Sequence, residues 1–166
     1  MKQDASARVF IAGSRAVSRL NDTIRGRLDR VIAAGHEVLI GDANGADRAV
    51  QQYLAGLEYP RVTVFCTGLR CRNNVGNWPT RNVAPPADVN AGFDFYAAKD
   101  REMAKLATHG LMLWDGESRG TFTNIRNLVR ADKPVVVYVS PVRKFFNVRT
   151  PDSVDQLLAQ IAAPAH

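Results

Sequence analysis

The feature that most constrains the fold of this chain is its alternation of short apolar runs with longer stretches of helical periodicity. Five apolar runs predict strands, and they span residues 8–12, 37–40, 61–65, 110–114 and 134–138. In most stretches between them, apolar residues recur at three- and four-residue spacing, which is typical of amphipathic helices. Strands without polar alternation are buried on both faces. We therefore predict an α/β fold, a three-layer sandwich with a doubly wound parallel sheet of about five strands.

Polar residues mark the expected starts of several helices. Asn21 or Asp22 is placed to cap the first helix, and Asp94 is placed to cap the third. The segment Ser153–Gln156 has the spacing of a capping box, which predicts a last helix at about residues 152–162.

The length and the termini give expectations about organisation and location. A chain of 166 residues has the size of one ordinary domain, so we expect a single domain over residues 1–166 with its core at about 8–140. No apolar stretch approaches the roughly 18 residues that span a membrane. The polar N-terminus does not resemble a signal peptide. We therefore expect a cytoplasmic protein without a membrane partner.

Residues 66–94 interrupt the alternation, because they are rich in Gly, Pro and Asn and have no sustained period. A structureless loop of this length is usually functional or mobile. Residues 59–87 contain four arginines and no acidic residue, which suits either a solvated basic loop or a loop that faces an anion. The net charge of +6 is compatible with nucleic acid or with a phosphate-bearing small ligand.

The two cysteines, Cys66 and Cys71, have neither the spacing of a C-x-x-C redox pair nor that of a zinc ribbon. We expect structural or incidental thiols, with a redox or metal role as the alternative. We expect no metal site and no cofactor.

Polar clusters in this sequence tend to follow the predicted strands, whereas the helix-to-strand turns are plainer. In an open parallel sheet, ligands bind beyond the carboxyl ends of the strands. We therefore take candidate ligand-binding residues from these clusters and from the third predicted helix. They are Gly13, Ser14, Arg15, Asp42, Asn44, Asp47, Lys99, Asp115, Gly116, Ser118, Arg119, Gly120 and Thr121.

The most informative cluster follows the fourth predicted strand, where a Gly-rich turn leads into a helix expected to start near Gly120 and Thr121. The first turn of a helix has unpaired N–H groups and the positive end of a dipole, so it suits phosphate. The segment lacks the Gly-Lys-Ser/Thr ending of a P-loop. It is therefore a candidate phosphate site of another kind.

Each of the other candidates has a structural alternative. Arg15 grips a phosphate or carboxylate, or it is an exposed loop arginine. Asp42 and Asn44 meet sugar hydroxyls, or one of them caps the second helix. Asp47 faces the ligand, or it pairs with Arg48 or with neighbouring loops.

Two further side chains have alternatives of the same kind. Lys99 stands in a run of four charged residues, so it lies on a solvated helix face or reaches the site together with Tyr96, three residues earlier. Trp114 belongs to the core or stacks on a base.

Four segments together resemble the SLOG superfamily, the Rossmann-like group named for the DNA-processing Smf proteins and the LOG phosphoribohydrolases. These segments are residues 13–15, 41–47, 95–100 and 114–121. The similarity covers roughly residues 8–140. It implies a Rossmann-like fold and a nucleotide or nucleotide-derived ligand, with phosphate at the start of the fourth helix. Many relatives associate through helices, which makes a homo-oligomer plausible.

The enzymatic relatives cleave the N-glycosidic bond of nucleoside monophosphates with an arginine and a glutamate. Their Gly-Gly-x-Gly-Thr-x-x-Glu pattern corresponds to residues 117–124, where Ser118 replaces the second glycine and Asn124 replaces the glutamate. An amide cannot act as a carboxylate base. The leading hypothesis is therefore binding of a nucleotide or nucleotide derivative, as a sensor or processing module.

Two other functions stay open. The first is a nucleoside-monophosphate N-glycosidase, or phosphoribohydrolase, that uses Asp42, Asp47, Asp115 or Glu117 in place of the missing glutamate. The second is single-stranded DNA binding, a less favoured reading in which basic loops with interleaved aromatic residues stack on bases. Trp78 and Phe93 are the aromatic candidates.

Overall fold

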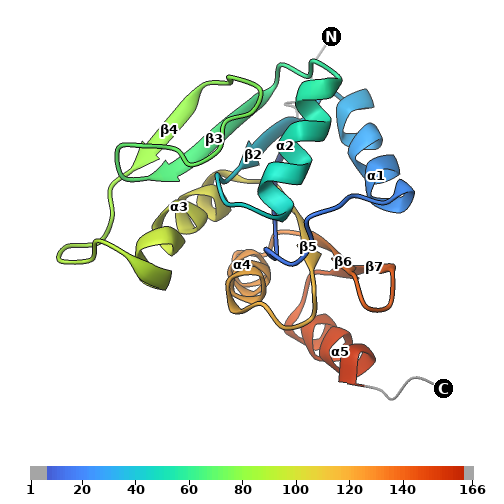
Figure 1. The fold of residues 1–166 in the computed structure, drawn as a ribbon. Helices are drawn as coiled ribbons and strands as arrows, with labels where there is room; N and C mark the ends of the chain where they lie inside the picture. Colours follow the sequence, from blue (N-terminus) through green and yellow to red (C-terminus); the bar gives the residue numbers. More distant parts are fainter. Residues whose placement is uncertain (1–6, 163–166) are drawn as a thin grey trace, which may run out of the picture.

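The computed structural model describes residues 7–162, which form one seven-stranded sheet with helices on both faces (Figure 1). The strands are β1 (Arg8–Gly13), β2 (Glu37–Ile40), β3 (Val62–Thr67), β4 (Thr80–Val83), β5 (His109–Trp114), β6 (Val135–Val139) and β7 (Lys144–Val148). The helices are α1 (Asp22–Ala33), α2 (Ala46–Gly56), α3 (Gly92–Leu106), α4 (Arg119–Arg130) and α5 (Pro151–Ala162). The predicted α/β class is confirmed.

The strand order is β4-β3-β2-β1-β5-β6-β7, and only the β6–β7 pair is antiparallel. From β1 at the centre of the sheet, the chain moves outward through β2, β3 and β4 and then returns to the other side of β1 at β5. The order therefore switches direction between β1 and β5. The connections leave the carboxyl ends of these two strands in opposite directions.

The expected number of about five strands was too low, because both edge strands were missed. β4 lies within the stretch expected to be a structureless loop, and three of its four residues are exposed. β7 is half-exposed and pairs only with β6. Edge strands are short and polar, so they lack the apolar run that marks a buried strand.

Successive residues of each strand point to opposite faces and fill two separate cores. Val9 and Ile11 of β1 pack in the core beneath α1 and α2. Phe10 and Ala12, the alternate residues of the same strand, pack in the core beneath α3, α4 and α5. The residue period of two in a strand produces this division.

The helix starts agree with expectation at α1 and differ at α3. Asn21 is the N-cap of α1, and its Oδ1 accepts a hydrogen bond from the N–H of Ile24 at 2.9 Å, which confirms one of the two expected caps. The predicted cap of α3 is wrong. Ala91 is the N-cap, and Asp94 lies inside the first turn of that helix. There its negative charge interacts favourably with the positive end of the helix dipole.

The capping box predicted for the last helix lies one turn too late. α5 begins at Pro151, and Thr150 precedes it. The N–H of Thr150 donates to Ser153 Oγ at 2.9 Å, and the N–H of Ser153 donates to Thr150 Oγ1 at 3.2 Å. Thr150 therefore serves as the first residue of the box and Ser153 as its fourth. Proline suits the first helical position, because that position needs no N–H donor.

Between residues 7 and 162, no helix is both long enough and apolar enough to cross a membrane.

Candidate functional site

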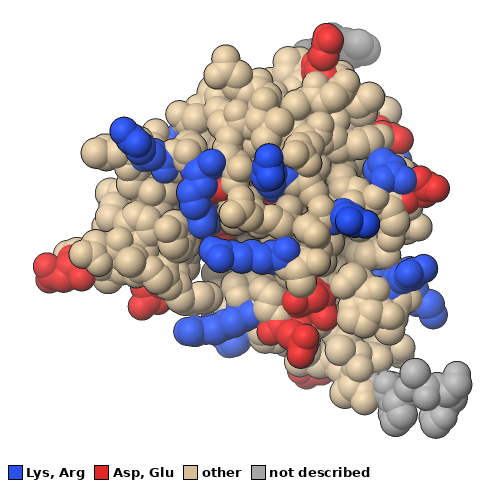
Figure 2. Space-filling model, in the orientation of Figure 1, with Lys and Arg blue, Asp and Glu red and all other residues tan. Residues whose placement is uncertain are grey.

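A cavity of about 690 Å³ opens at the carboxyl edge of the parallel strands, at the switch between β1 and β5. Its walls come from the loops after β1, β2 and β3, the first half of α3, the turn after β5 and the start of α4. Figure 2 shows several Lys and Arg side chains gathered at the middle of this face of the molecule. A cleft lined by positive charge concentrates anions.

Eight of the thirteen predicted ligand-binding residues line this cavity: Gly13, Arg15, Asp47, Lys99, Asp115, Ser118, Gly120 and Thr121. The other five do not line it, and they are Ser14, Asp42, Asn44, Gly116 and Arg119. The topology therefore brings most of the predicted cluster together at one edge of the sheet.

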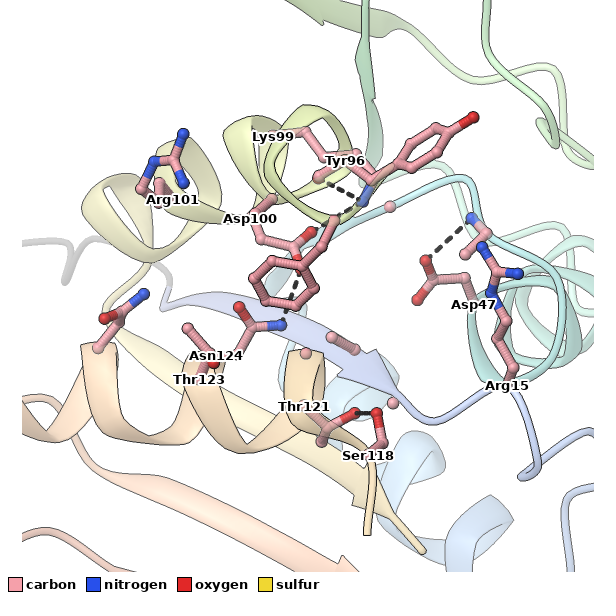
Figure 3. Close-up of a pocket in the computed structure, with 18 of the residues that line it drawn as sticks. Arg15, Asp47, Tyr96, Lys99, Asp100, Arg101, Ser118, Thr121, Thr123 and Asn124 are labelled. Atoms are coloured by element: carbon pink, nitrogen blue, oxygen red, sulfur yellow. Dashed lines mark hydrogen bonds and ion pairs between the residues drawn. The ribbon is translucent and has the colours of Figure 1, made fainter. Parts of the chain in front are cut away.

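The start of α4 forms the floor of the cavity (Figure 3). Ser118 is the N-cap, and among the described residues its side chain makes no capping hydrogen bond. The first N–H groups of a helix have no intrahelical acceptor, so they can receive an external anion. Thr121 is buried, and its Oγ1 lies 3.4 Å from both Ser118 Oγ and Ser14 Oγ. Hydroxyls and N–H groups therefore converge on the same floor.

Asp115 organises the turn before α4. Its Oδ1 accepts hydrogen bonds from the N–H of Ser118 at 2.8 Å, the N–H of Glu117 at 2.9 Å and the Oγ of Ser14 at 3.1 Å. Burial disfavours the charged form, yet these hydrogen bonds hold the pKa of Asp115 below its usual value. An incoming phosphate therefore meets the N–H groups of the helix rather than those of the turn.

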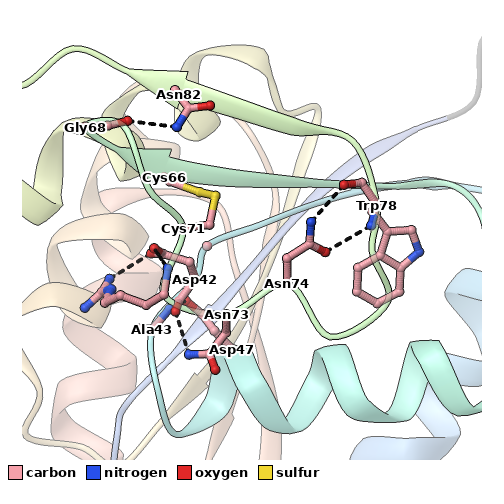
Figure 4. The surroundings of a disulfide bond; sticks show 12 residues. Asp42, Ala43, Asp47, Cys66, Gly68, Cys71, Asn73, Asn74, Trp78 and Asn82 are labelled. Atoms are coloured by element: carbon pink, nitrogen blue, oxygen red, sulfur yellow. Dashed lines mark hydrogen bonds and ion pairs between the residues drawn. A yellow bond between two sulfur atoms is a disulfide. The ribbon is translucent and has the colours of Figure 1, made fainter.

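Asp42 does not line the cavity, but it binds Arg72, which does (Figure 4). It is 2% exposed, and its two carboxylate oxygens accept hydrogen bonds from the N–H and the Nη2 of Arg72, both at 2.8 Å. The guanidinium of Arg72 lies 4.0 Å from the ring centroid of Tyr96, and both side chains line the cavity. Asn44 accepts a hydrogen bond from Asn73 at 3.0 Å. Neither Asp42 nor Asn44 caps α2, whose N-cap is Gly45.

The sequence signal for Arg72 was the run of four arginines without an acidic residue. Only this member of the run lines the cavity. Arg70 is exposed, and Arg81 pairs with Glu102 at 3.4 Å. The run therefore contains an anion-facing residue among solvated ones.

The expectation of thiols at Cys66 and Cys71 is wrong, because the two residues form a disulfide (Figure 4). A tight turn after β3 brings their Cα atoms to 5.1 Å. Gly68 stands in this turn at a φ of +84°, a conformation that glycine adopts readily. The spacings of redox and zinc motifs do not describe a disulfide between two cysteines that are this close in sequence. The disulfide fixes the chain directly before Arg72.

The loop after the disulfide is anchored by Gln51, a fully buried residue of α2. Its Nε2 donates to the carbonyl oxygens of Gly41 at 2.9 Å and of Asn73 at 3.2 Å. Its Oε1 accepts from the N–H of Val75 at 2.9 Å. The first half of the stretch expected to be a structureless loop is thus tied to α2.

The α3 wall carries a buried chain of polar contacts (Figure 3). Lys99 is 4% exposed, and its Nζ donates to Asp100 Oδ1 at 2.9 Å and to the carbonyl of Tyr96 at 3.2 Å. The other oxygen of Asp100 accepts from Asn124 Nδ2 at 3.0 Å. Burial disfavours the ammonium, but Asp100 and Asp47 outweigh it and raise the pKa of Lys99. The expectation of a solvated face was wrong for Lys99.

Asp47 is buried in the opposite wall, and of its two alternative pairings it has the one with a neighbouring loop and not the one with the exposed Arg48. Asp47 Oδ2 accepts from the N–H of Ala43 at 3.1 Å. Burial raises the pKa of Asp47 to about 7, although Lys99 lowers it.

The aromatic candidates for stacking have different surroundings. Trp114 belongs to the core and stacks on Phe122 with ring centroids 5.5 Å apart. Trp78 is 8% exposed, and its Nε1 donates to the carbonyl of Tyr59 at 2.8 Å, so its ring faces the core. Phe93 is exposed at the rim of the cavity.

Comparison with protein-family models, curated proteins and solved structures finds no match. Over the described part of the chain, no three His, Cys, Asp or Glu side chains are grouped so that they could hold a metal ion.

Proposed function

We propose that this chain binds a nucleotide or nucleotide-derived ligand in the cavity between β1 and β5, in the manner of a Rossmann-like, SLOG-related domain. The observation that carries the proposal is the start of α4, whose uncapped first turn faces the cavity opposite Arg15 and Arg72. N–H groups, hydroxyls and guanidinium groups together form a phosphate site.

The position and the size of the cavity support the same proposal. Ligands of doubly wound sheets bind where the strand order reverses, and the order β3-β2-β1-β5-β6 reverses at this cavity. Small-molecule sites have volumes of about 300–1,000 Å³. The cavity volume of about 690 Å³ falls in this range. Single-stranded DNA binding has less support, because the ring of Trp78 is buried.

A thermal-shift screen with AMP, ADP-ribose, NAD and cyclic nucleotides tests the proposal. We expect at least one of them to raise the melting temperature. We expect Thr121→Val and Arg15→Ala each to weaken its binding about tenfold or more, because a hydrogen bond to a charged group contributes about 1.5–3 kcal/mol.

Arg19→Ala is the matched control, since Arg19 is exposed in the same loop as Arg15 but does not line the cavity. This variant should bind the same nucleotide with an affinity within about twofold of the wild type, because salt screens the loss of an exposed charge outside the cavity. A panel without any shift, or a binder unaffected by both site variants, would show that the proposal is wrong.

A second candidate function is hydrolysis of a nucleoside monophosphate in the same cavity. Asp100 favours it, because this carboxylate is held beside Asn124, at the position where the enzymatic relatives have their glutamate. Of the four carboxylates considered from sequence, Asp42 and Glu117 do not line the cavity. Asp47 and Asp115 line it, but Asp115 already accepts hydrogen bonds from the backbone of the turn before α4.

Chromatography of nucleoside monophosphates incubated with the protein tests this second function. We expect release of free base that Asp100→Asn reduces at least a hundredfold, because an amide cannot supply a base. Release that is unchanged in Asp100→Asn would exclude Asp100 as the base, whereas no release at all argues for binding alone.

A further inference from the structure

Asp47 is a buried carboxyl group that lines the cavity, and one of its oxygens has no hydrogen-bond partner among the described residues. The side chain stands in the first turn of α2 and is 6% exposed. Its Oδ2 accepts from the N–H of Ala43 at 3.1 Å, and its Oδ1 is buried without a hydrogen-bond partner in the described part of the protein. A Cβ at Gly41 would lie 2.7 Å from Oδ2, so the carboxyl group is pressed against that backbone.

The charged groups around Asp47 are already engaged with other partners. On α3, Lys99 donates to Asp100. In the loops after β2 and β3, Asp42 holds Arg72. Within residues 7–162, Asp47 takes part in no ion pair.

Arg15, in the loop after β1, also lines the cavity near Asp47 (Figure 3). The effect of Lys99 on Asp47 is opposed by the carboxylates of Asp42 and Asp100. The electrostatic surroundings therefore do not compensate for a buried negative charge on Asp47.

Burial of a charged carboxylate with a single hydrogen bond is costly, so such a group takes up a proton instead. The proton resides on Oδ1, because Oδ2 already accepts a hydrogen bond from Ala43. Burial raises the pKa of Asp47 to about 7. The carboxyl group is therefore neutral in about half of the molecules at pH 7.

We propose that Asp47 binds the ligand as a neutral carboxylic acid, with Oδ1–H donating a hydrogen bond to an uncharged acceptor on the base or sugar of the nucleotide. This inference rests on the proposed function and adds to it a condition on which ligands bind. A ligand with a lone pair at that point satisfies the buried group. A ligand with an N–H donor there leaves two hydrogens facing each other, and its binding is weaker.

The proposal gives a definite sign for the pH dependence of binding. The ligand binds the protonated form, so affinity is full below the pKa of about 7 and falls tenfold per pH unit above it. From pH 6 to pH 9 the dissociation constant of the wild type should rise about a hundredfold. Asp47→Asn keeps an N–H donor at this position. We expect this variant to bind with less than about threefold change over the same range.

Isothermal titration calorimetry with ADP-ribose and with cyclic AMP measures this dependence. The phosphates of both probes stay fully ionised over this pH range, so the titration of the probe does not contribute. Asp155→Asn removes one exposed carboxylate from α5 and should retain the pH dependence of the wild type. Binding that Asp47→Asn abolishes at every pH, or wild-type affinity that does not fall above pH 7, would overturn the proposal.

A ligand-free measurement separates this inference from the proposed function. A carboxyl group whose pKa is raised on folding contributes stability that is full below its unfolded pKa of about 4. That stability is lost as the pH rises to about 7. The melting temperature of the wild type should therefore fall relative to that of Asp47→Asn between pH 5 and pH 7.5.

The two measurements distinguish the possible failures. If the difference in melting temperature between wild type and Asp47→Asn is the same from pH 5 to pH 7.5, Asp47 is charged over this range and the inference is wrong. If the difference changes with pH as expected but neither probe binds at any pH, both the ligand contact and the binding of these nucleotides fail, while the neutral state of Asp47 stands.

Discussion

Gly13→Ala is expected to lower the free energy of unfolding by about 3 kcal/mol, at the upper end of the cost of overpacking. A Cβ at this position would lie 2.5 Å from the carbonyl oxygen of Leu113, 2.7 Å from the Cβ of Ala46 and 2.9 Å from the Cβ of Leu113. These atoms belong to backbone or to the root of a side chain, so they cannot rotate away. The methyl group would push β1, β5 and α2 apart at the centre of the sheet and at the edge of the cavity. Urea denaturation measures the loss.

Gly26→Ala is the matched control. Gly26 lies inside α1, and a Cβ there has no atom of the described residues within 4 Å. Alanine favours a helix interior over glycine by about 0.5–1 kcal/mol, so this variant should be more stable than the wild type. If Gly13→Ala were as stable as the wild type, the close approach of β1, β5 and α2 would be wrong.

Asp42→Ala is expected to lower the free energy of unfolding by about 2–3 kcal/mol, between the values for an exposed and a fully buried ion pair. Asp42 is buried and accepts two hydrogen bonds at 2.8 Å from Arg72, whose side chain is 29% exposed. Without the carboxylate, the N–H and the guanidinium of Arg72 lose their partner. Arg72 then leaves its place over Tyr96, so we also expect weaker binding of the nucleotide.

Asp22→Ala is the matched control for Asp42→Ala, because Asp22 forms an exposed ion pair with Arg25. Exposed pairs and single charges near a helix start each contribute less than about 1 kcal/mol. Denaturation curves of the two variants separate the effects. Equal losses in both would contradict a structural role for the Asp42–Arg72 pair.

The central part of the fold could be predicted from sequence, and its edges could not. Buried parallel strands such as β2 appear as unbroken apolar runs, because both faces meet helices. β4 lacks this signal. It is a strand only through its parallel pairing with β3, in which Arg81 aligns with Phe65, and that pairing depends on the tertiary path of the chain. Its composition of Thr, Arg, Asn and Val resembles that of a loop.

The candidate site shows the same division. Gly13, Arg15 and Thr121 line one cavity because they stand at or beyond the carboxyl ends of parallel strands at the same edge of the sheet, which the alternation predicts. Arg72 is placed by its pair with Asp42, thirty residues earlier. Asp100 is placed by Asn124 and Lys99. The Asp42–Arg72 and Asp100–Asn124 contacts join distant parts of the chain and have no periodic signal. The arginine run indicated the region of Arg72 but not its partner.

The division of the interior into two cores has a consequence for how the protein tolerates change. Leu54 packs only in the core under α1 and α2, and Met103 only in the core under α3, α4 and α5. Substitutions that share no packed neighbour have additive effects on stability, within about 0.3–0.5 kcal/mol. The sheet therefore acts as a partition between two nearly independent layers. Substitutions in the core beneath α1 therefore leave the packing of α3 and α4 undisturbed. The hydrogen bonds that join Lys99, Asp100 and Asn124 depend on that packing.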